Sequence, residues 1–177
     1  MRSIPRFVWS IAVAVVTYPI VRRILERCGV IETTAEQWFR RVCREQDADA
    51  IDELLAEDCV AYGIFGEEIR GRDAFKDFHA QFCTLFAETD IQVLAEVAEG
   101  RRRAIRCLGK LKMAGQDEIL ELPGMGFVEI RHGQIVEAYN YWNFLGLLEQ
   151  MSLMPEGSFE KAISGTLTPH PAAKGSE

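Results

Sequence analysis

His79 is the side chain of this sequence that best combines a reactive group with a place inside a regular element. Of the other histidines, His132 falls in a predicted turn and His170 in the C-terminal tail. An imidazole beside an apolar helix stripe could serve a bound molecule as a general base. The alternative is a structural histidine at the boundary of an amphipathic helix, and the sequence leaves both interpretations open.

Tyr62 is a second candidate, because its hydroxyl could donate a hydrogen bond to a carbonyl or enolate oxygen. The alternative is a packed tyrosine whose hydroxyl reaches water. Asp77 and Glu68 are expected to be solvated, and Glu129 to point outward with Arg131. No phosphate-binding loop, dinucleotide fingerprint, zinc-protease motif or serine-hydrolase elbow occurs in the sequence.

The five cysteines are scattered, and no C-x-x-C pair occurs among them. An odd set with this spacing predicts neither a disulfide framework nor a zinc site. We therefore expect buried, reduced thiols in a cytoplasmic protein that needs no metal and no cofactor.

Three helices are predicted to come first. Thr33 and Glu36 form a capping box that opens the first, Asp47 or Asp49 can cap a second over residues 51–55, and a third begins at residues 71–73. The third carries an apolar stripe with a helical period, beside His79. The stripe consists of Phe75, Phe78, Phe82 and Phe86.

Strands are predicted at residues 59–65 and then from residue 91 to Trp142, where apolar residues recur with period two. Ile91, Val93, Ala95 and Val97 are expected to share one face. Gly109 lies on the apolar face of the next strand, where a missing side chain leaves space. A strand follows at residues 125–131, and His132-Gly133 forms a tight turn before the last strand. Helices segregated from an antiparallel sheet predict an α+β fold, with a curved sheet and three N-terminal helices around an apolar pocket.

Length and charge set the limits of these expectations. The chain has 177 residues, 48% of them hydrophobic, and a formal net charge of −7. One domain of ordinary composition fits this length, and the acidic balance disfavours a nucleic-acid partner. We expect the domain at residues 32–155, an N-terminal helix or membrane anchor at 1–31, and a flexible tail at 156–177.

The N-terminal segment contains fifteen uncharged residues, 7–21, with arginines on both sides. This run is short for a membrane-spanning helix. Membrane contact through residues 4–21, a helix packed on the domain or on a partner, and a cleaved signal peptide remain open alternatives.

The order of elements and three sequence blocks resemble the nuclear transport factor 2-like superfamily, in its branch of SnoaL-like polyketide cyclases and limonene-epoxide-hydrolase-like proteins. The blocks are residues 54–58, residues 69–75 and residues 133–151, and the last is the most specific. The resemblance implies a cone-shaped, cystatin-like roll. It also implies a homodimer formed through the open face of the sheet.

The resemblance places catalytic aspartates of relatives at Asn140 and Asn143 of this chain. An amide cannot exchange a proton near neutral pH, so Asn140 could only orient a ligand or donate a hydrogen bond to it. A strand histidine of the cyclases falls on Gly126. No known acid-base constellation of the fold is intact here.

Two functional hypotheses follow. In the first, a cofactor-free enzyme cyclises, isomerises, dehydrates or opens the epoxide of a hydrophobic polyketide, terpenoid or steroid-like molecule in secondary metabolism. Its catalytic residues would be Asn140, His79 and Tyr62. In the second, the domain binds a ligand or a protein without catalysis, tethered near a membrane. In either case, the expected substrate-binding residues are Trp38, Phe39, Phe78, Phe82, Met125, Phe127 and Trp142.

Overall fold

A computed structural model describes residues 21–22, 24–26, 31–64 and 68–166. The element order is α2 (Thr34–Gln37), η1 (Trp38–Arg44), α3 (Asp49–Leu54), β1 (Leu55–Tyr62), β2 (Ile69–Arg70), α4 (Arg72–Leu85), β3 (Phe86–Glu99), β4 (Arg102–Met113), β5 (Ile119–Arg131), β6 (Gln134–Trp142), α5 (Phe144–Gln150) and α6 (Ser158–Ile163). The predicted membrane contact through residues 4–21 lies outside the described residues except for Val21. Of the helices in the described part of the chain, none has the length and apolar character that crossing a membrane requires.

The capping box that opens α2 is present. The Thr33 hydroxyl accepts from the Glu36 N–H, and the Glu36 carboxylate accepts from the Thr33 N–H. The helix continues directly into η1, which is a π-helix where the sequence predicts an ordinary helix. Such wide turns are rare and are often found at functional sites.

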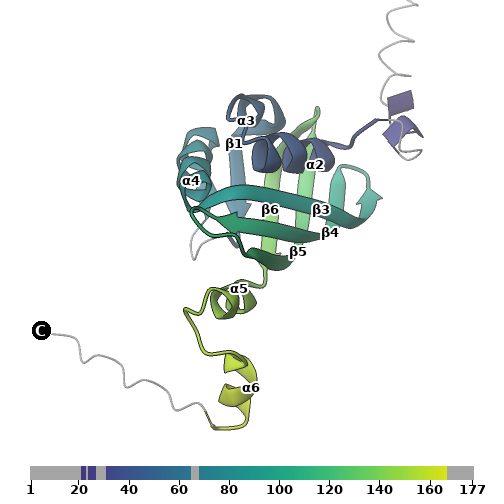
Figure 1. The fold of residues 1–177 in the computed structure, drawn as a ribbon. Coiled ribbons are helices and arrows are strands. Elements are labelled where there is room, and N and C mark those ends of the chain that lie inside the picture. The colour runs from purple at the N-terminus through teal and green to yellow at the C-terminus, as the bar shows by residue number, and fades with distance from the viewer. Residues whose placement is uncertain (1–20, 23, 27–30, 65–67, 167–177) are drawn as a thin grey trace, which may run out of the picture.

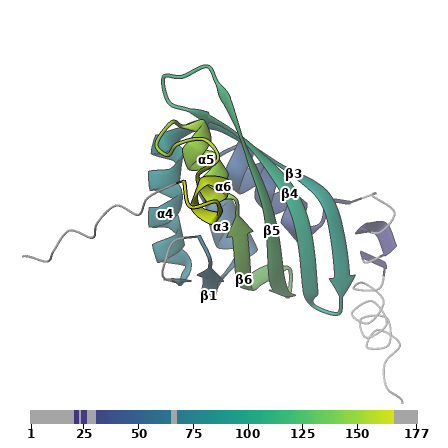
Figure 2. The ribbon, with the colours of Figure 1, turned by 90° about the horizontal axis from the view of Figure 1, so that it is seen from below.

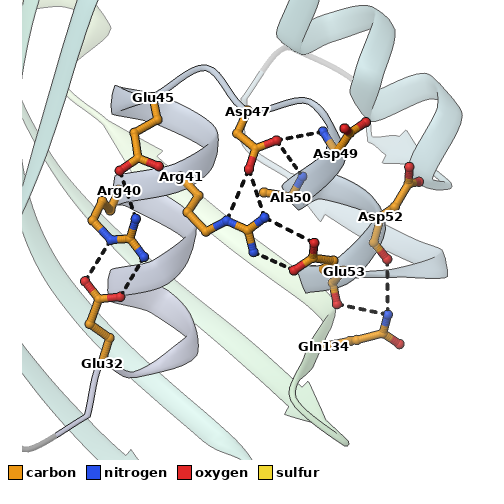
Figure 3. A network of polar contacts seen from close by, with 10 residues as sticks. All are labelled: Glu32, Arg40, Arg41, Glu45, Asp47, Asp49, Ala50, Asp52, Glu53 and Gln134. Carbon is orange, nitrogen blue, oxygen red and sulfur yellow. Dashed lines mark hydrogen bonds and ion pairs between the residues drawn. The ribbon is translucent and has the colours of Figure 1, made fainter.

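An ion-pair network holds η1 to α3 (Figure 3). Arg41 contacts Asp47 at 2.8 Å and Glu53 at 2.5 Å. Asp47 also accepts hydrogen bonds from the backbone N–H groups of Asp49 and Ala50. Of the two predicted caps for α3, Asp47 is therefore the one that satisfies its first turn.

The sheet has six strands in the order β2-β1-β6-β5-β4-β3. The strands β3 to β6 form an antiparallel meander, and β1 extends the sheet by pairing in parallel with β6 and antiparallel with the edge strand β2. Figure 1 shows α2, α3 and α4 grouped together beside the sheet, with α5 and α6 beyond its end, and Figure 2 shows β3 to β6 side by side. The expected α+β fold with a curved sheet is confirmed.

Strand β5 begins at Ile119, six residues earlier than the sequence predicts. Pro123 and Gly124 obscure its period. The proline is tolerated because β6 ends at this point: the Pro123 carbonyl accepts from the Asn143 N–H, and no partner strand needs the missing proline N–H.

A β-bulge between Val93 and Ala95 changes the face that β3 presents. Ile91 and Val93 remain on the inner side, but Val97 is 70% exposed. The expectation that Ile91, Val93, Ala95 and Val97 all share one face is therefore wrong, because the bulge places Ala95 and Val97 on the opposite face. Glu96 turns inward instead, where it pairs with Arg103 at 3.1 Å and burial raises the pKa of its carboxyl.

Helix α6 occupies residues 158–163, where the sequence predicts an irregular tail. The buried side chains form two separate clusters. One joins the helices to β1, β4, β5 and β6 around Ile51 and Val42, and the other surrounds Leu111 and Leu122.

Candidate functional site

A cavity of about 600 Å³ extends between the two core clusters and takes its lining from both. The sheet supplies inward-facing residues such as Ile105, Cys107 and Gly126, and η1 and α4 supply aromatic side chains. This volume lies within the range of small-molecule sites. The lining is apolar apart from a few uncharged polar groups, and it includes no Asp, Glu, Lys or Arg of the described residues.

The exposed members of the lining mark where the cavity opens. Leu85 at the end of α4, Phe144 in α5 and Leu153 after α5 are 46%, 38% and 66% exposed. Gln81 of α4 is also exposed and lines the cavity. The mouth therefore lies between α4 and the segment that follows β6.

The segment after β6 is held in place by the Gln150 side chain, which hydrogen-bonds to the backbone of β5 as a neighbouring strand would. The Gln150 amide donates to the Glu121 carbonyl and accepts from the Glu121 N–H, both at 2.8 Å. These backbone groups of β5 lie beyond Trp142, where β6 no longer pairs with β5. Leu147, Leu148 and Met151 consequently face the cavity, a contribution that the sequence analysis missed.

His79 is buried in the cavity lining. Its Nε2 lies 2.8 Å from the Val42 carbonyl oxygen and 3.4 Å from the Cys83 sulfur. Because the carbonyl can only accept, Nε2 carries the proton, and Nδ1 holds the lone pair of the neutral ring. Val42 lies in the last turn of η1, so the histidine also satisfies an acceptor near the end of the π-helix.

Asn140 also lines the cavity, and its Nδ2 donates to the Tyr62 carbonyl oxygen at 3.0 Å. The backbone of β1 turns away next to it at Gly63, whose φ is +76°. A Cβ at this position would lie 1.9 Å from the Asn140 carbonyl oxygen, so only glycine fits the turn.

The Tyr62 ring lies elsewhere. It stacks on Tyr139 with ring centroids 4.6 Å apart, and it is not among the residues that line the cavity. The structure therefore brings His79 and Asn140 to one cavity and places the Tyr62 hydroxyl outside it.

Five of the seven expected substrate-binding residues line the cavity: Trp38, Phe39, Phe78, Phe82 and Trp142. Met125 and Phe127 do not, being 58% and 42% exposed. They point to the opposite face because their neighbours Gly124, Gly126 and Val128 are the inward residues of β5. The glycines hid the alternation, and we no longer assign Met125 and Phe127 to the site.

The thiols of the lining are not activated. Burial raises the pKa of Cys43 to about 12 and that of Cys107 to about 11, so both remain protonated at neutral pH. The described residues contain no group of three or more His, Cys, Asp or Glu side chains that could hold a metal ion.

The sequence matches a known protein family independently of this geometry. A family model described as a SnoaL-like domain matches residues 35–138. A search of curated proteins finds no match.

Similar solved structures include wild-type IdmH, a proposed polyketide cyclase from Streptomyces antibioticus. It is 20% identical, with 67% of this chain and 96% of that chain covered and a TM-score of 0.58. An LEH-like epoxide hydrolase from M. tuberculosis is 18% identical, with 67% and 90% covered and a TM-score of 0.57. A protein with a ketosteroid isomerase-like fold from Catenulispora acidiphila is 16% identical, with 78% and 98% covered and a TM-score of 0.61.

Proposed function

Because this chain belongs to the SnoaL-like domain family, we propose that it is a small enzyme acting on a hydrophobic, uncharged molecule in the cavity. The substrate class is a polyketide, terpenoid or steroid-like compound, and the reaction is a cyclisation, isomerisation, dehydration or epoxide opening that needs no cofactor. The observation that carries this proposal is the apolar cavity, whose few polar groups include His79 and Asn140.

His79 is the group that we assign to proton transfer. Its bond to the Val42 carbonyl holds the ring in one orientation and one tautomer, with the lone pair on Nδ1. No carboxylate of the described residues lines the cavity, so no other conventional base is available there. Asn140 binds the ligand, and the aromatic side chains of η1, α4 and β6 supply the apolar contact.

The missing carboxylate also favours a second candidate, a non-catalytic binding domain. In that case, the role of His79 is only structural, as the donor of a hydrogen bond to the Val42 carbonyl near the end of η1. The two roles make different demands on the ring, because only the catalytic role uses Nδ1.

Substitutions of His79 separate these roles. Glutamine retains an N–H that can reach the Val42 carbonyl but has no basic nitrogen, whereas alanine loses both. The probe is 5-nitrobenzisoxazole, a flat neutral compound whose C–H proton passes to a base as its N–O bond opens. We expect the wild-type protein to accelerate this ring opening and His79→Gln to slow it by 10²-fold or more with a nearly unchanged melting temperature.

The matched control is His132→Gln in the β5–β6 turn, which should leave the rate unchanged. Binding of the probe is measured separately. If the wild-type protein binds the probe without accelerating its ring opening, or if His79→Gln is as fast as wild type, the assigned base is wrong and the binding-domain hypothesis is favoured.

Homodimerisation is part of this proposal. Strand registers place Val97, Ala104, Phe127 and Tyr139 in one row across the outer face of the sheet. Ala95, Arg106, Met125 and Tyr141 form the next row. We call these two rows the outer band; with the exception of Arg106 they carry no charge. The charged pair Arg102–Glu129 lies directly beside the band on one side, and Lys110–Glu121 lies beyond the uncharged Leu108–Pro123 pair on the other. An apolar centre with a polar rim is typical of a protein interface.

A further inference from the structure

Asn140 of β6 and Gly126 of β5 are direct cross-strand partners, and both line the cavity. The Asn140 Nδ2 group donates to the Tyr62 carbonyl oxygen. A backbone carbonyl can only accept, so this bond determines which end of the amide is nitrogen and which is oxygen. The atom that remains to accept a hydrogen bond from a ligand is Oδ1.

Gly126 determines what can approach that oxygen. A Cβ built at Gly126 would lie 4.0 Å from the Asn140 Oδ1 and 3.7 Å from the Tyr139 carbonyl oxygen. Both are ordinary contact distances, so a side chain would fit here without displacing the backbone. The glycine therefore leaves open a space on the inner face of β5 that begins beside Oδ1.

The charge of the lining limits the ligand further. No Asp, Glu, Lys or Arg of the described residues lines the cavity, so no carboxylate, ammonium or guanidinium group is there to pair with a charged ligand. An anionic ligand group at Oδ1 would face a carbonyl oxygen and lose its hydration without a counter-ion, which is costly. A neutral hydroxyl group would instead donate to Oδ1.

We propose that the Asn140 Oδ1 and the open space beside Gly126 form a subsite for a hydrogen-bond donor, a hydroxyl group on an otherwise apolar, uncharged ligand. This inference rests on the proposed function, because it requires a ligand in the cavity. It gives Asn140 the opposite role to that expected from the sequence, in which the amide donates to a ligand oxygen. Gly126 thereby becomes a residue that determines specificity.

The test compares three neutral probes of similar shape: 2-naphthol, which donates a hydrogen bond, 2-acetylnaphthalene, which only accepts, and naphthalene, which does neither. Their binding to the full chain is measured by fluorescence titration at neutral pH. We expect 2-naphthol to bind about 3- to 10-fold more tightly than 2-acetylnaphthalene, as one hydrogen bond allows. Asn140→Leu should remove this preference and retain naphthalene binding.

Gly126→Val supplies an independent variant, since valine suits a strand and its Cβ has room. It should weaken 2-naphthol more than naphthalene. Tyr141→Phe, on the outer face of the same strand as Asn140, is the control and should bind all three probes as wild type does. Three results would overturn the subsite. They are a preference for 2-acetylnaphthalene, equal binding of 2-naphthol and 2-acetylnaphthalene, and a preference for 2-naphthol that persists in Asn140→Leu or in Gly126→Val.

The outcomes distinguish the subsite from the function on which it rests. If naphthalene binds but the 2-naphthol preference is absent, the subsite is wrong and a hydrophobic ligand site still stands. If none of the three probes binds, the proposed function falls and the subsite falls with it. Should Asn140→Leu fail to fold, the Gly126→Val result decides alone.

Discussion

Among the buried residues, His79 and Thr89 show how partner atoms decide what a polar side chain does. His79 donates its Nε2 proton to the Val42 carbonyl, so the orientation of the imidazole ring is set by the fold and not by a ligand. Thr89 is also buried, at 3% exposure, but its hydroxyl has no hydrogen-bond partner among the described residues. An unpaired buried hydroxyl is costly because it has lost water without replacement.

Thr89→Val should therefore stabilise the protein. Valine has the same shape without the hydroxyl, and we expect the free energy of unfolding to rise by about 1 kcal/mol. Chemical denaturation measures it. The control is Thr84→Val, since the exposed Thr84 hydroxyl donates to the Ala80 carbonyl at 3.0 Å. A loss of stability in Thr89→Val would show that the hydroxyl has a partner that it needs.

Between elements, ion pairs and one amide side chain hold the walls of the cavity. Arg41 of η1 lowers the pKa of Asp47 and of Glu53 by hydrogen bonding to their carboxylates. A folded-state pKa below the unfolded value means that these carboxylates stabilise the fold above about pH 4. That contribution is lost as the pH falls through their lower, folded-state pKa values.

Arg41→Gln should lower stability most near pH 7, and the difference from wild type should shrink below about pH 4, where the carboxylates become protonated in both proteins. Denaturation curves between pH 7 and pH 3 measure this. Arg106→Gln, on the outer face of β4, is the control. A stability difference that stays constant over this range would contradict the assigned ion pairs.

Gln150 should control whether α5 covers the cavity. Gln150→Leu removes two hydrogen bonds to Glu121, each worth about 1 kcal/mol. We expect faster amide hydrogen exchange in residues 119–123 and 143–150, with exchange of the β3–β4 pair unchanged. Gln116→Leu, an exposed glutamine in the β4–β5 loop, is the matched control. Uniformly faster exchange throughout the domain would indicate global destabilisation instead.

For the whole molecule, the sheet separates two apolar surfaces. Its inner face bounds the cavity, and its outer face carries the outer band, in which Val97, Met125 and Tyr141 are 70%, 58% and 76% exposed. Exposed apolar patches of this kind commonly mark an interface. The two faces alternate along each strand, so a single bulge or glycine decides which residues face the cavity and which lie on the outer face.

The variant Met125→Lys with Tyr141→Glu should convert a dimer to a monomer. These residues are cross-strand partners, so the introduced opposite charges support the sheet while they disrupt an apolar interface. Light scattering should give twice the chain mass of 20.0 kDa for wild type and a single mass for the variant. The control exchanges the charges of a cross-strand pair outside the band, Lys110→Glu with Glu121→Lys. A monomeric wild type would contradict the dimer.

Local patterns were sufficient for the fold class and for most of the elements, but not for α6, the π-helical form of η1 or the start of β5. The Thr33–Glu36 capping box, the His132-Gly133 turn and the Gln134–Trp142 strand each depend on residues close in sequence, and the structure contains all three. Alternation along β4 likewise predicted its inner face. Five of the aromatic residues expected at the site also line the cavity, because their helical or strand period already places them toward the core.

Only the tertiary structure decided which face of the sheet each side chain occupies and which groups the polar side chains bind. The glycines and the proline of β5 interrupt the alternation of apolar and polar residues in the sequence. Only the pairing of β5 with β4 and β6 placed Met125 and Phe127 on the outer face of the sheet. The bulge in β3, the bond from His79 to Val42 and the direction of the Asn140 amide are set by groups distant in sequence. Such contacts depend on register and on which backbone acceptors lack a partner, and no local pattern specifies either.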